Sequence, residues 1–225
     1  SDSALGGKTA VNLGAGKNLA GTFHHPRLVC VEPRLLSTLP ARDFRSGLAE
    51  VVKSALLSAA FWRRLEGLAG DLAAREGAAV AEAIARSLRV KADVVMRDPD
   101  ESRGLRHVLN LGHTVGHALE GASAYRLRHG EAVAWGLLAA LRLSEARGLL
   151  AERTAEAAAR VVRTLLAPPP LSATIRRSWP SFLRADKKQD RGGLRDVLLS
   201  GPGRPHLERV TVPELVASLP DERGG

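Results

Sequence analysis

The strongest constraint on this fold is a long region of helical periodicity, because apolar residues recur three or four positions apart from residue 41 to about residue 167. Five helices are expected there, at 43–65, 78–96, 105–120, 130–147 and 152–166, the first with Asp43 as its N-cap. Two short strands follow, at 194–199 and 206–212, joined by the turn Gly201-Pro202-Gly203. The pattern predicts a mostly α domain with a short C-terminal β-hairpin.

The first forty residues do not share this periodicity. They are rich in glycine, and Leu28-Val29-Cys30-Val31 is the only stretch in the first 190 residues that predicts a short buried strand. A single strand leaves its backbone hydrogen-bonding groups unpaired. We therefore expect its partners either later in the chain or in a sheet that this chain does not contain, and we divide the chain into residues 1–40 and residues 41–225.

Composition excludes several classes of protein. The 225 residues are 44% hydrophobic and 25% charged, which is typical of a globular chain that buries a core. The single cysteine, Cys30, excludes a disulfide framework and a cysteine-based zinc site. No apolar run reaches the roughly 18 residues of a membrane span, and Ser1-Asp2-Ser3 does not resemble a signal peptide. We therefore expect a cytoplasmic protein that does not bind membranes.

The net charge is +9, from 33 basic and 24 acidic residues. Arginines alternate with acidic residues along the expected helices and only 4% of residues are aromatic, so we expect a small anionic substrate and no nucleic acid. Six of the basic residues are lysines: Lys8, Lys17, Lys53, Lys91, Lys187 and Lys188. Because the other basic residues are arginines, we expect the six lysines to lie at sites that need a compact ammonium group. Chance codon usage is the alternative explanation for their positions.

Polar groups that can perform chemistry are concentrated in the third expected helix. Arg106, Asn110, His113 and His117 are spaced by four, three and four residues, which places them on one stripe of a helix. Leucine and valine surround this stripe, so we expect it to line a cavity and not a solvated face. A histidine pair at this spacing indicates a metal or catalytic site, and ordinary hydrogen-bonded histidines are the alternative.

A metal site there needs further ligands. Zinc binds imidazole nitrogen and carboxylate oxygen, and catalytic zinc often has three protein ligands. Glu50, which interrupts an apolar run, and His129, which precedes Gly130-Glu131, are the candidates. A surface carboxylate at Glu50 and a capping or loop histidine at His129 are the alternatives.

The order of several short motifs resembles one known family. These are Gly6-Gly7-Lys8-Thr9-Ala10-Val11-Asn12, Gly16-Lys17-Asn18, Thr38-Leu39-Pro40, Ser46-Gly47-Leu48-Ala49-Glu50-Val51-Val52-Lys53, Leu109-Asn110-Leu111-Gly112-His113-Thr114-Val115-Gly116-His117, His129-Gly130-Glu131-Ala132-Val133 and Asp186-Lys187-Lys188. In this order the chain resembles the 3-dehydroquinate synthase family. The resemblance extends from residue 6 to about residue 200.

The resemblance implies a reaction and its cofactors. Bound NAD and a divalent metal, zinc or cobalt, act on 3-deoxy-D-arabino-heptulosonate 7-phosphate, which loses phosphate and closes to 3-dehydroquinate. The implied metal ligands are Glu50, His113 and His129. The implied NAD contacts are Lys8, Lys17, Leu35, Leu36, Ser37 and Thr38. The implied substrate contacts are Lys8, Asn18, Lys91, Arg106, Asn110, His117, Lys187 and Lys188. The implied catalytic residues are His117, Lys53, Arg106 and Asn110, and the family also implies a homodimer.

The resemblance also shows two departures. The family has an acidic pair before the Gly-x-Arg motif, which is Gly104-Leu105-Arg106 in this chain. Here Ser102 or Arg103 stands where the second acid of that pair is expected, which puts one supporting carboxylate of the site in doubt. Members of the family begin with an α/β nucleotide-binding domain, so residues 1–40 are interpreted as its remnant, with 28–31 as a remnant strand, and residues 41–225 as the helical metal- and substrate-binding domain. The chain could be a fragment, a truncated product or one half of a split protein, and in each case we expect it to bind NAD poorly and to turn over slowly or not at all.

Three other functions fit parts of the pattern. A sister sugar-phosphate cyclase such as a 2-deoxy-scyllo-inosose synthase would use the same metal ligands on another substrate. A metal-dependent polyol dehydrogenase shares the architecture, but the lysine motifs argue against it. A catalytically inactive helical remnant that serves in protein interactions is the third alternative.

Overall fold

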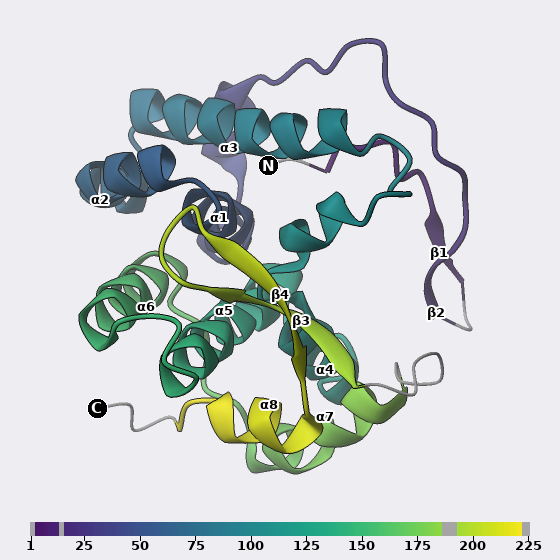
Figure 1. Cartoon of the computed structure of the whole chain (residues 1–225). Coiled ribbons are helices and arrows are strands. Elements are labelled where there is room, and N and C mark those ends of the chain that lie inside the picture. Colours follow the sequence, from purple (N-terminus) through teal and green to yellow (C-terminus); the bar gives the residue numbers. More distant parts are fainter. Residues whose placement is uncertain (1–2, 14–15, 186–192, 222–225) are drawn as a thin grey trace.

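The computed structural model describes residues 3–13, 16–185 and 193–221, and Figure 1 shows a mostly helical molecule. The N-terminal part comprises β1 (Val11–Leu13), β2 (Gly16–Ala20) and the 3-10 helix η1 (Pro33–Thr38). The helices that follow are α1 (Ala41–Leu56), α2 (Ala59–Ala73), α3 (Gly77–Arg97), the 3-10 helix η2 (Leu105–Asn110), α4 (His113–Ala122), α5 (His129–Ala146), α6 (Glu152–Leu166) and α7 (Ala173–Ala185). The chain continues through β3 (Leu194–Leu199), β4 (Pro205–Val210) and α8 (Val212–Ser218).

Helix α5 is the centre of the hydrophobic core. Every residue from 130 to 141 is buried, because this helix is apolar on nearly all its faces and packs against α1, α4, α6, α8 and β3. Figure 1 shows the β3–β4 hairpin lying across the helices beside α5. A helix that is enclosed in this way gives a rigid base for side chains at its first turn.

Two glycines allow α5 to approach α4 closely. A Cβ atom at Gly136 would lie 1.8 Å from the carbonyl oxygen of Gly112, and a Cβ at Gly112 would lie 2.8 Å from the backbone nitrogen of Leu137. Gly130 has the same role against α1, because a Cβ there would lie 1.9 Å from the carbonyl oxygen of Ser46. These three contacts fix the start of α5 relative to both neighbouring helices.

Several predicted helices are confirmed, and the first is wrong. The helices expected at 78–96, 130–147 and 152–166 correspond to α3, α5 and α6. The helix expected at 43–65 is two helices, since α1 ends at Leu56 and α2 starts after its N-cap Ser58, whose hydroxyl accepts from the backbone of Phe61. Asp43 lies within the first turn of α1 and is not its N-cap, which is Pro40.

The helix expected at 105–120 is also wrong. Residues 105–110 form η2, and α4 begins only at His113. Gly112 adopts a left-handed conformation with φ of 76°, which an α-helix cannot continue through and which glycine adopts without strain. Arg106 and Asn110 therefore do not share one helical stripe with His113 and His117.

The C-terminal hairpin is confirmed, with a shorter second strand. Strands β3 and β4 pair antiparallel in the register Leu194↔Val210 to Leu199↔Pro205. The second strand stops at Val210 because the Thr211 side chain caps a further helix, α8, by accepting from the backbone of Glu214. Helices α7 and α8 were not predicted from the sequence.

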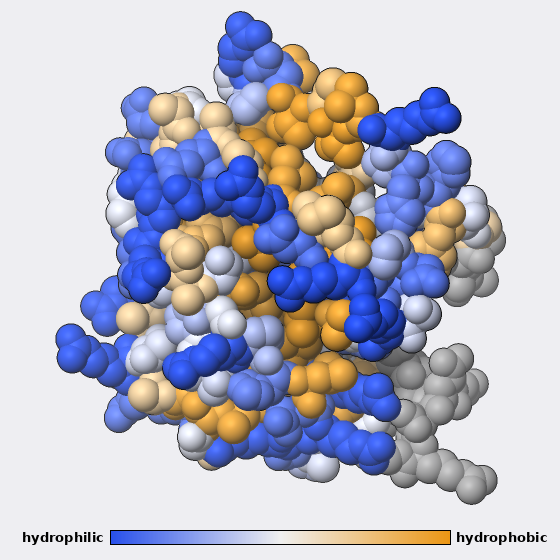
Figure 2. All heavy atoms as spheres, turned by 45° about the horizontal axis from the view of Figure 1, so that its top comes forward, coloured by the Kyte–Doolittle hydropathy of each residue, from blue (hydrophilic) through white to orange (hydrophobic). Residues whose placement is uncertain are grey.

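The buried strand expected at 28–31 is wrong. Residues 28–31 form no strand, and Leu28 is 77% exposed. The described part of the chain offers these residues no neighbouring strand, and β1 and β2 instead pair antiparallel with each other. Large apolar side chains remain exposed in this segment, including Phe23, Leu28 and Leu35. Figure 2 shows an apolar band exposed between hydrophilic residues on the upper face of the molecule.

In the described part of the chain, no helix has both the length and the apolar character that crossing a membrane requires.

Candidate metal centre

A carboxylate and two imidazoles from three helices meet at one point. Glu50 belongs to the third turn of α1, whereas His113 and His129 are the first residues of α4 and α5. The Oε1 atom of Glu50 lies 3.5 Å from Nε2 of His113 and 3.3 Å from Nε2 of His129. One ligand atom from each of the three residues lies within 4.8 Å of the others, a spacing that a single metal ion can bridge.

The electrostatics around Glu50 keep it ionised. Burial raises the pKa of Glu50, but the hydrogen bonds with His113 and His129 and the charge of Lys53 outweigh burial and hold the pKa well below its usual range. Lys53, one turn away, is buried and forms an ion pair with Oε2 of Glu50. This pairing leaves Oε1 directed at the two imidazoles.

His129 lies between two carboxylates. A hydrogen bond with Glu120, and to a smaller extent one with Glu50, raises the pKa of His129 to about 9. Burial of the ring lowers this pKa, but by less. A divalent cation at this position would compete with the proton of His129 for the same nitrogen. Metal binding at such a site is coupled to the release of that proton.

A second group of possible ligands adjoins the first. One ligand atom each from His117, Glu120 and His129 also lies within 4.8 Å of the others. The ring of His117 is 5.3 Å from that of His113 and 6.1 Å from that of His129, measured between centroids. The two groups share His129.

A cavity of about 520 Å³ opens beside these ligands. It is lined by eight of the residues expected in the site, namely Lys8, Glu50, Lys53, Lys91, Arg106, Asn110, His113 and His129. Four of these side chains are cations, which suits an anionic ligand. The side chains come from residue 8 near the N-terminus, α1, α3, η2, α4 and α5.

Arg106 contacts protein groups at the edge of this cavity. The guanidinium donates to the carbonyl oxygens of Gly6 at 2.9 Å and Pro99 at 3.0 Å, and its Nε atom has no hydrogen-bond partner. Buried Asp98 accepts from the backbone nitrogens of Arg103 and Arg106. The Lys8 Nζ atom lies 2.6 Å from Oε2 of Glu101, so an acidic residue of this turn pairs with a cation of the cavity.

The remaining predicted site residues lie elsewhere. Leu35, Leu36, Ser37 and Thr38 form η1 and do not line the cavity. Lys17 and Asn18 lie on β2, and their side chains are outside what the structure describes. Lys187 and Lys188 lie outside the described residues. The roles that the resemblance gives to these residues stay predictions.

Sequence reasoning missed two buried carboxylates near the site. Glu120 contacts His129, and Asp196 on β3 accepts from the Thr114 hydroxyl at 2.8 Å, beside His113. Glu120 follows His117 by three residues in an otherwise apolar stretch, and that spacing is a usable signal. Asp196 has no comparable signal, because only the fold brings β3 against α4.

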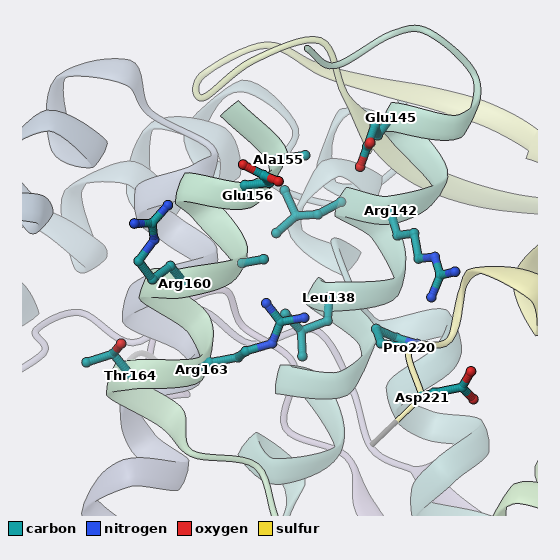
Figure 3. Close-up of a pocket in the computed structure, with 12 residues that line it drawn as sticks. Leu138, Arg142, Glu145, Ala155, Glu156, Arg160, Arg163, Thr164, Pro220 and Asp221 are labelled. Carbon is teal, nitrogen blue, oxygen red and sulfur yellow. The ribbon is translucent and has the colours of Figure 1, made fainter. Parts of the chain in front are cut away.

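A larger cavity, of about 650 Å³, lies between α5, α6 and residues 220–221. Figure 3 shows Arg163 pointing into the space between the two helices, with Leu138 on the facing side. Three arginines and three acidic residues line this cavity, so the formal charges cancel. It holds no histidine, and we therefore place the functional site at the smaller cavity.

Solved structures share this arrangement of helices. A 2-epi-5-epi-valiolone synthase from Streptomyces hygroscopicus subsp. jinggangensis 5008, with NAD+ and Zn2+ bound, superposes with a TM-score of 0.84 at 30% identity, over 97% of this chain and 61% of that one. A 2-deoxy-scyllo-inosose synthase complexed with carbaglucose-6-phosphate, NAD+ and Co2+ gives 0.81 at 28% identity, over 97% and 62%. The chain therefore shares the fold of the corresponding part of these two synthases.

The sequence comparisons define the family. A model of the 3-dehydroquinate synthase C-terminal region matches residues 47–189, and one of the N-terminal region matches residues 1–46. The 3-dehydroquinate synthases of Pyrobaculum neutrophilum (strain DSM 2338 / JCM 9278 / NBRC 100436 / V24Sta) and Xylella fastidiosa (strain M12) are 44% and 41% identical over 217 and 229 residues. These alignments cover 95% and 96% of this chain but 63% and 62% of the relatives. The chain belongs to the 3-dehydroquinate synthase family.

Proposed function

We propose that this chain carries the metal- and substrate-binding part of a 3-dehydroquinate synthase, which converts 3-deoxy-D-arabino-heptulosonate 7-phosphate to 3-dehydroquinate and phosphate. The observation that carries the proposal is the convergence of Glu50, His113 and His129 beside a cavity lined by cations. The identity of 41% and 44% to curated 3-dehydroquinate synthases supports the same reaction.

The donor set fits a divalent metal, zinc or cobalt. Two imidazole nitrogens and one carboxylate oxygen form a common set for catalytic zinc, and three protein ligands leave coordination positions for substrate oxygens. The structural relatives were solved with Zn2+ and Co2+. A metal held by Glu50, His113 and His129 would supply polarisation of substrate oxygens, and bound NAD would supply reversible hydride transfer.

The chain's own residues would hold and orient the substrate. Lys8, Lys91 and Arg106 offset the charges of a carboxylate and a phosphate, and Asn110 can hydrogen-bond a hydroxyl. Lys53 keeps Glu50 ionised and fixed in direction through the ion pair at Oε2. His117 would relay protons between the substrate and its surroundings, because an imidazole can both accept and donate a proton.

A second candidate function is that of a sister sugar-phosphate cyclase, because the two solved relatives are a 2-deoxy-scyllo-inosose synthase and a 2-epi-5-epi-valiolone synthase. Their identity to this chain is 28% and 30%, against 41% and 44% for the 3-dehydroquinate synthases. The higher identity favours the heptulosonate phosphate. A substrate panel that also contains glucose 6-phosphate, the sugar phosphate that carbaglucose-6-phosphate resembles, distinguishes the two.

The test measures phosphate release by the purified full chain with the heptulosonate phosphate, NAD and Co2+. We expect release that requires both additions and is lost in Glu50→Gln, since removal of the carboxylate charge weakens the metal site. Glu156→Gln, an exposed change on α6, is the matched control and should behave as the parent chain. Co2+ binding without turnover of any panel member would contradict the activity but leave the metal centre.

We also propose a cytoplasmic homodimer, as the resemblance implies. Sedimentation of the purified chain at several concentrations measures the mass directly. A monomer at all concentrations would contradict the proposed dimer.

A further inference from the structure

The two nitrogens of the His129 ring have different neighbours. Nε2 lies 3.3 Å from Glu50 Oε1, on the side of the proposed metal, whereas Nδ1 lies 3.5 Å from Oε1 of Glu120. A metal-bound histidine usually coordinates through one nitrogen and donates the N–H of the other to a carboxylate or carbonyl. Glu120 lies where that second partner belongs.

Glu120 is unusual because it is an acid inside the core. It is 3% exposed, and burial of a carboxylate is costly unless a partner compensates for the lost water. It lies on α4 seven residues after His113, two turns along the same helix, so one short helix carries both a ligand and the acid. The nearby cation is the His129 ring.

The packing of α4 on α5 fixes the distance between Glu120 and His129. A Cβ at Gly116 would lie 3.3 Å from the Cα of Val133, so the two backbones approach closely one turn before Glu120. His129 is the first residue of α5, whose next residue, Gly130, packs against the Ser46 carbonyl. The backbones that carry Glu120 and His129 are therefore held at a fixed separation.

We propose that Glu120 is a positioning residue that holds the Nδ1–H form of His129 and so directs Nε2 toward the metal. The inference rests on the proposed metal centre and adds a residue outside its ligand set. Glu120 accepts the Nδ1 proton in a hydrogen bond, and the lone pair of Nε2 is then available for coordination. Glu120 thereby acts through His129 and does not touch the substrate.

Glu120 has an alternative role, that of a direct metal ligand, which the experiment must distinguish from positioning. The atoms of His117, Glu120 and His129 also lie close enough to hold a metal, in which case Glu120 would be a ligand. Replacement by glutamine distinguishes the roles, because the amide oxygen still accepts from Nδ1–H but is a much poorer ligand than a carboxylate. Replacement by alanine removes both functions.

The experiment titrates Co2+ into the metal-free full chain and follows both the dissociation constant and the visible absorption of the bound ion. We expect Glu120→Ala to weaken Co2+ binding by about 10- to 100-fold and to alter the spectrum, as loss of outer-shell partners does elsewhere. Glu120→Gln should lose less than about 10-fold. Glu156→Gln, the same replacement at an exposed acid on α6, is the control and should retain both affinity and spectrum.

Each outcome decides the matter. Parent-like affinity and spectrum in folded Glu120→Ala and Glu120→Gln would overturn the positioning role alone. Equal and severe losses in both variants would identify Glu120 as a ligand and also overturn it. A parent chain that binds no Co2+ would overturn the metal centre and this inference together. Circular dichroism verifies folding, and Glu120→Gln carries the test if the alanine variant does not fold.

Discussion

The described residues before Ala41 and those after it are built by different interactions. Buried hydrophobic side chains begin at Phe44, and none lies within residues 3–11 or 20–40, where side-chain burial is described, whereas residues 44–219 enclose one continuous core. The candidate ligands Glu50, His113 and His129 all belong to the packed part. Lys8 reaches the same cavity from the unpacked part. The candidate metal centre thus lies on the core, and only part of the cavity wall depends on the N-terminal segment.

Polar contacts hold the N-terminal segment in place. Arg106 donates to the Gly6 carbonyl, His25 lies 3.1 Å from the Pro99 carbonyl, and Lys8 pairs with Glu101. Such contacts contribute about 1 kcal/mol each or less when exposed. The segment can therefore open locally while the core stays folded. Four predictions test this difference, in order of decreasing effect.

The largest effect is expected from Gly136→Ala. The new methyl would lie 1.8 Å from the Gly112 carbonyl oxygen, so α4 and α5 must separate. Overpacking of side chains costs about 1–3 kcal/mol, and here backbone must move, so we expect a loss of about 4 kcal/mol or more. Urea unfolding measures the loss. Gly67→Ala on α2, where no atom lies within 4 Å, is the control and should stabilise the chain by up to about 1 kcal/mol.

A pair of leucine substitutions compares the two regions directly. Leu65 is 0% exposed and Leu28 is 77% exposed. We expect Leu65→Ala to lower the free energy of unfolding by about 3 kcal/mol through a cavity, and Leu28→Ala to change it by less than about 0.5 kcal/mol. Equal losses in urea unfolding would mean that the N-terminal segment is part of the core.

The free energy of unfolding of the helical part should depend on pH because of Asp196. Burial raises the pKa of Asp196 to about 6, although hydrogen bonds from Thr114 and Val197 act in the opposite direction. The pKa of Asp196 is thus higher in the folded chain than in the unfolded chain. The neutral acid's contribution to the free energy of unfolding is therefore fully present below the unfolded pKa and is lost as the pH rises through about 6. Asp196→Asn should therefore gain about 2 kcal/mol relative to the parent chain between pH 4 and pH 8.

Urea unfolding of both chains at each pH measures this difference. The comparison between the two chains cancels the other titrating groups. Glu156→Gln, a surface change on α6, should follow the parent chain at every pH. A constant offset between Asp196→Asn and the parent chain would contradict the assignment.

The smallest effect concerns the attachment of the N-terminal segment. Arg106→Met removes both donors to Gly6 and Pro99, so we expect trypsin to cleave after exposed Arg27 about 10-fold faster, while the core stability changes little. Mass spectrometry follows the fragment that begins at Leu28. Arg163→Met on α6 is the control, and an unchanged cleavage rate in Arg106→Met would show that other contacts hold the segment.

The sequence predicted the candidate ligands better than the local structure that carries them. Glu50, His113 and His129 were identified by residue type and motif order, which do not depend on helix boundaries. The single polar stripe was wrong because Gly112 takes a left-handed conformation, and spacing alone does not show where a glycine breaks a helix. Glu120 and Asp196 were missed because burial of an acid is a tertiary property.

The secondary structure was also predicted well in some segments and wrongly in others. Helices with strong periodicity, such as α3, α5 and α6, were predicted within about one residue of their bounds. The break at Ser58 was missed, since a single capping serine inside an apolar run gives a weak signal. The strand expected at 28–31 failed because a strand needs partners, and an apolar run does not show whether they exist.

Both imidazoles of the candidate centre are the first residues of helices, His113 of α4 and His129 of α5. The positive ends of two peptide dipoles consequently meet at the mouth of one cavity. Unlike an ammonium, this contribution neither titrates nor costs side-chain entropy. The attraction for an anion at this place is therefore part of the backbone itself, and it would persist if every lysine of the cavity were replaced.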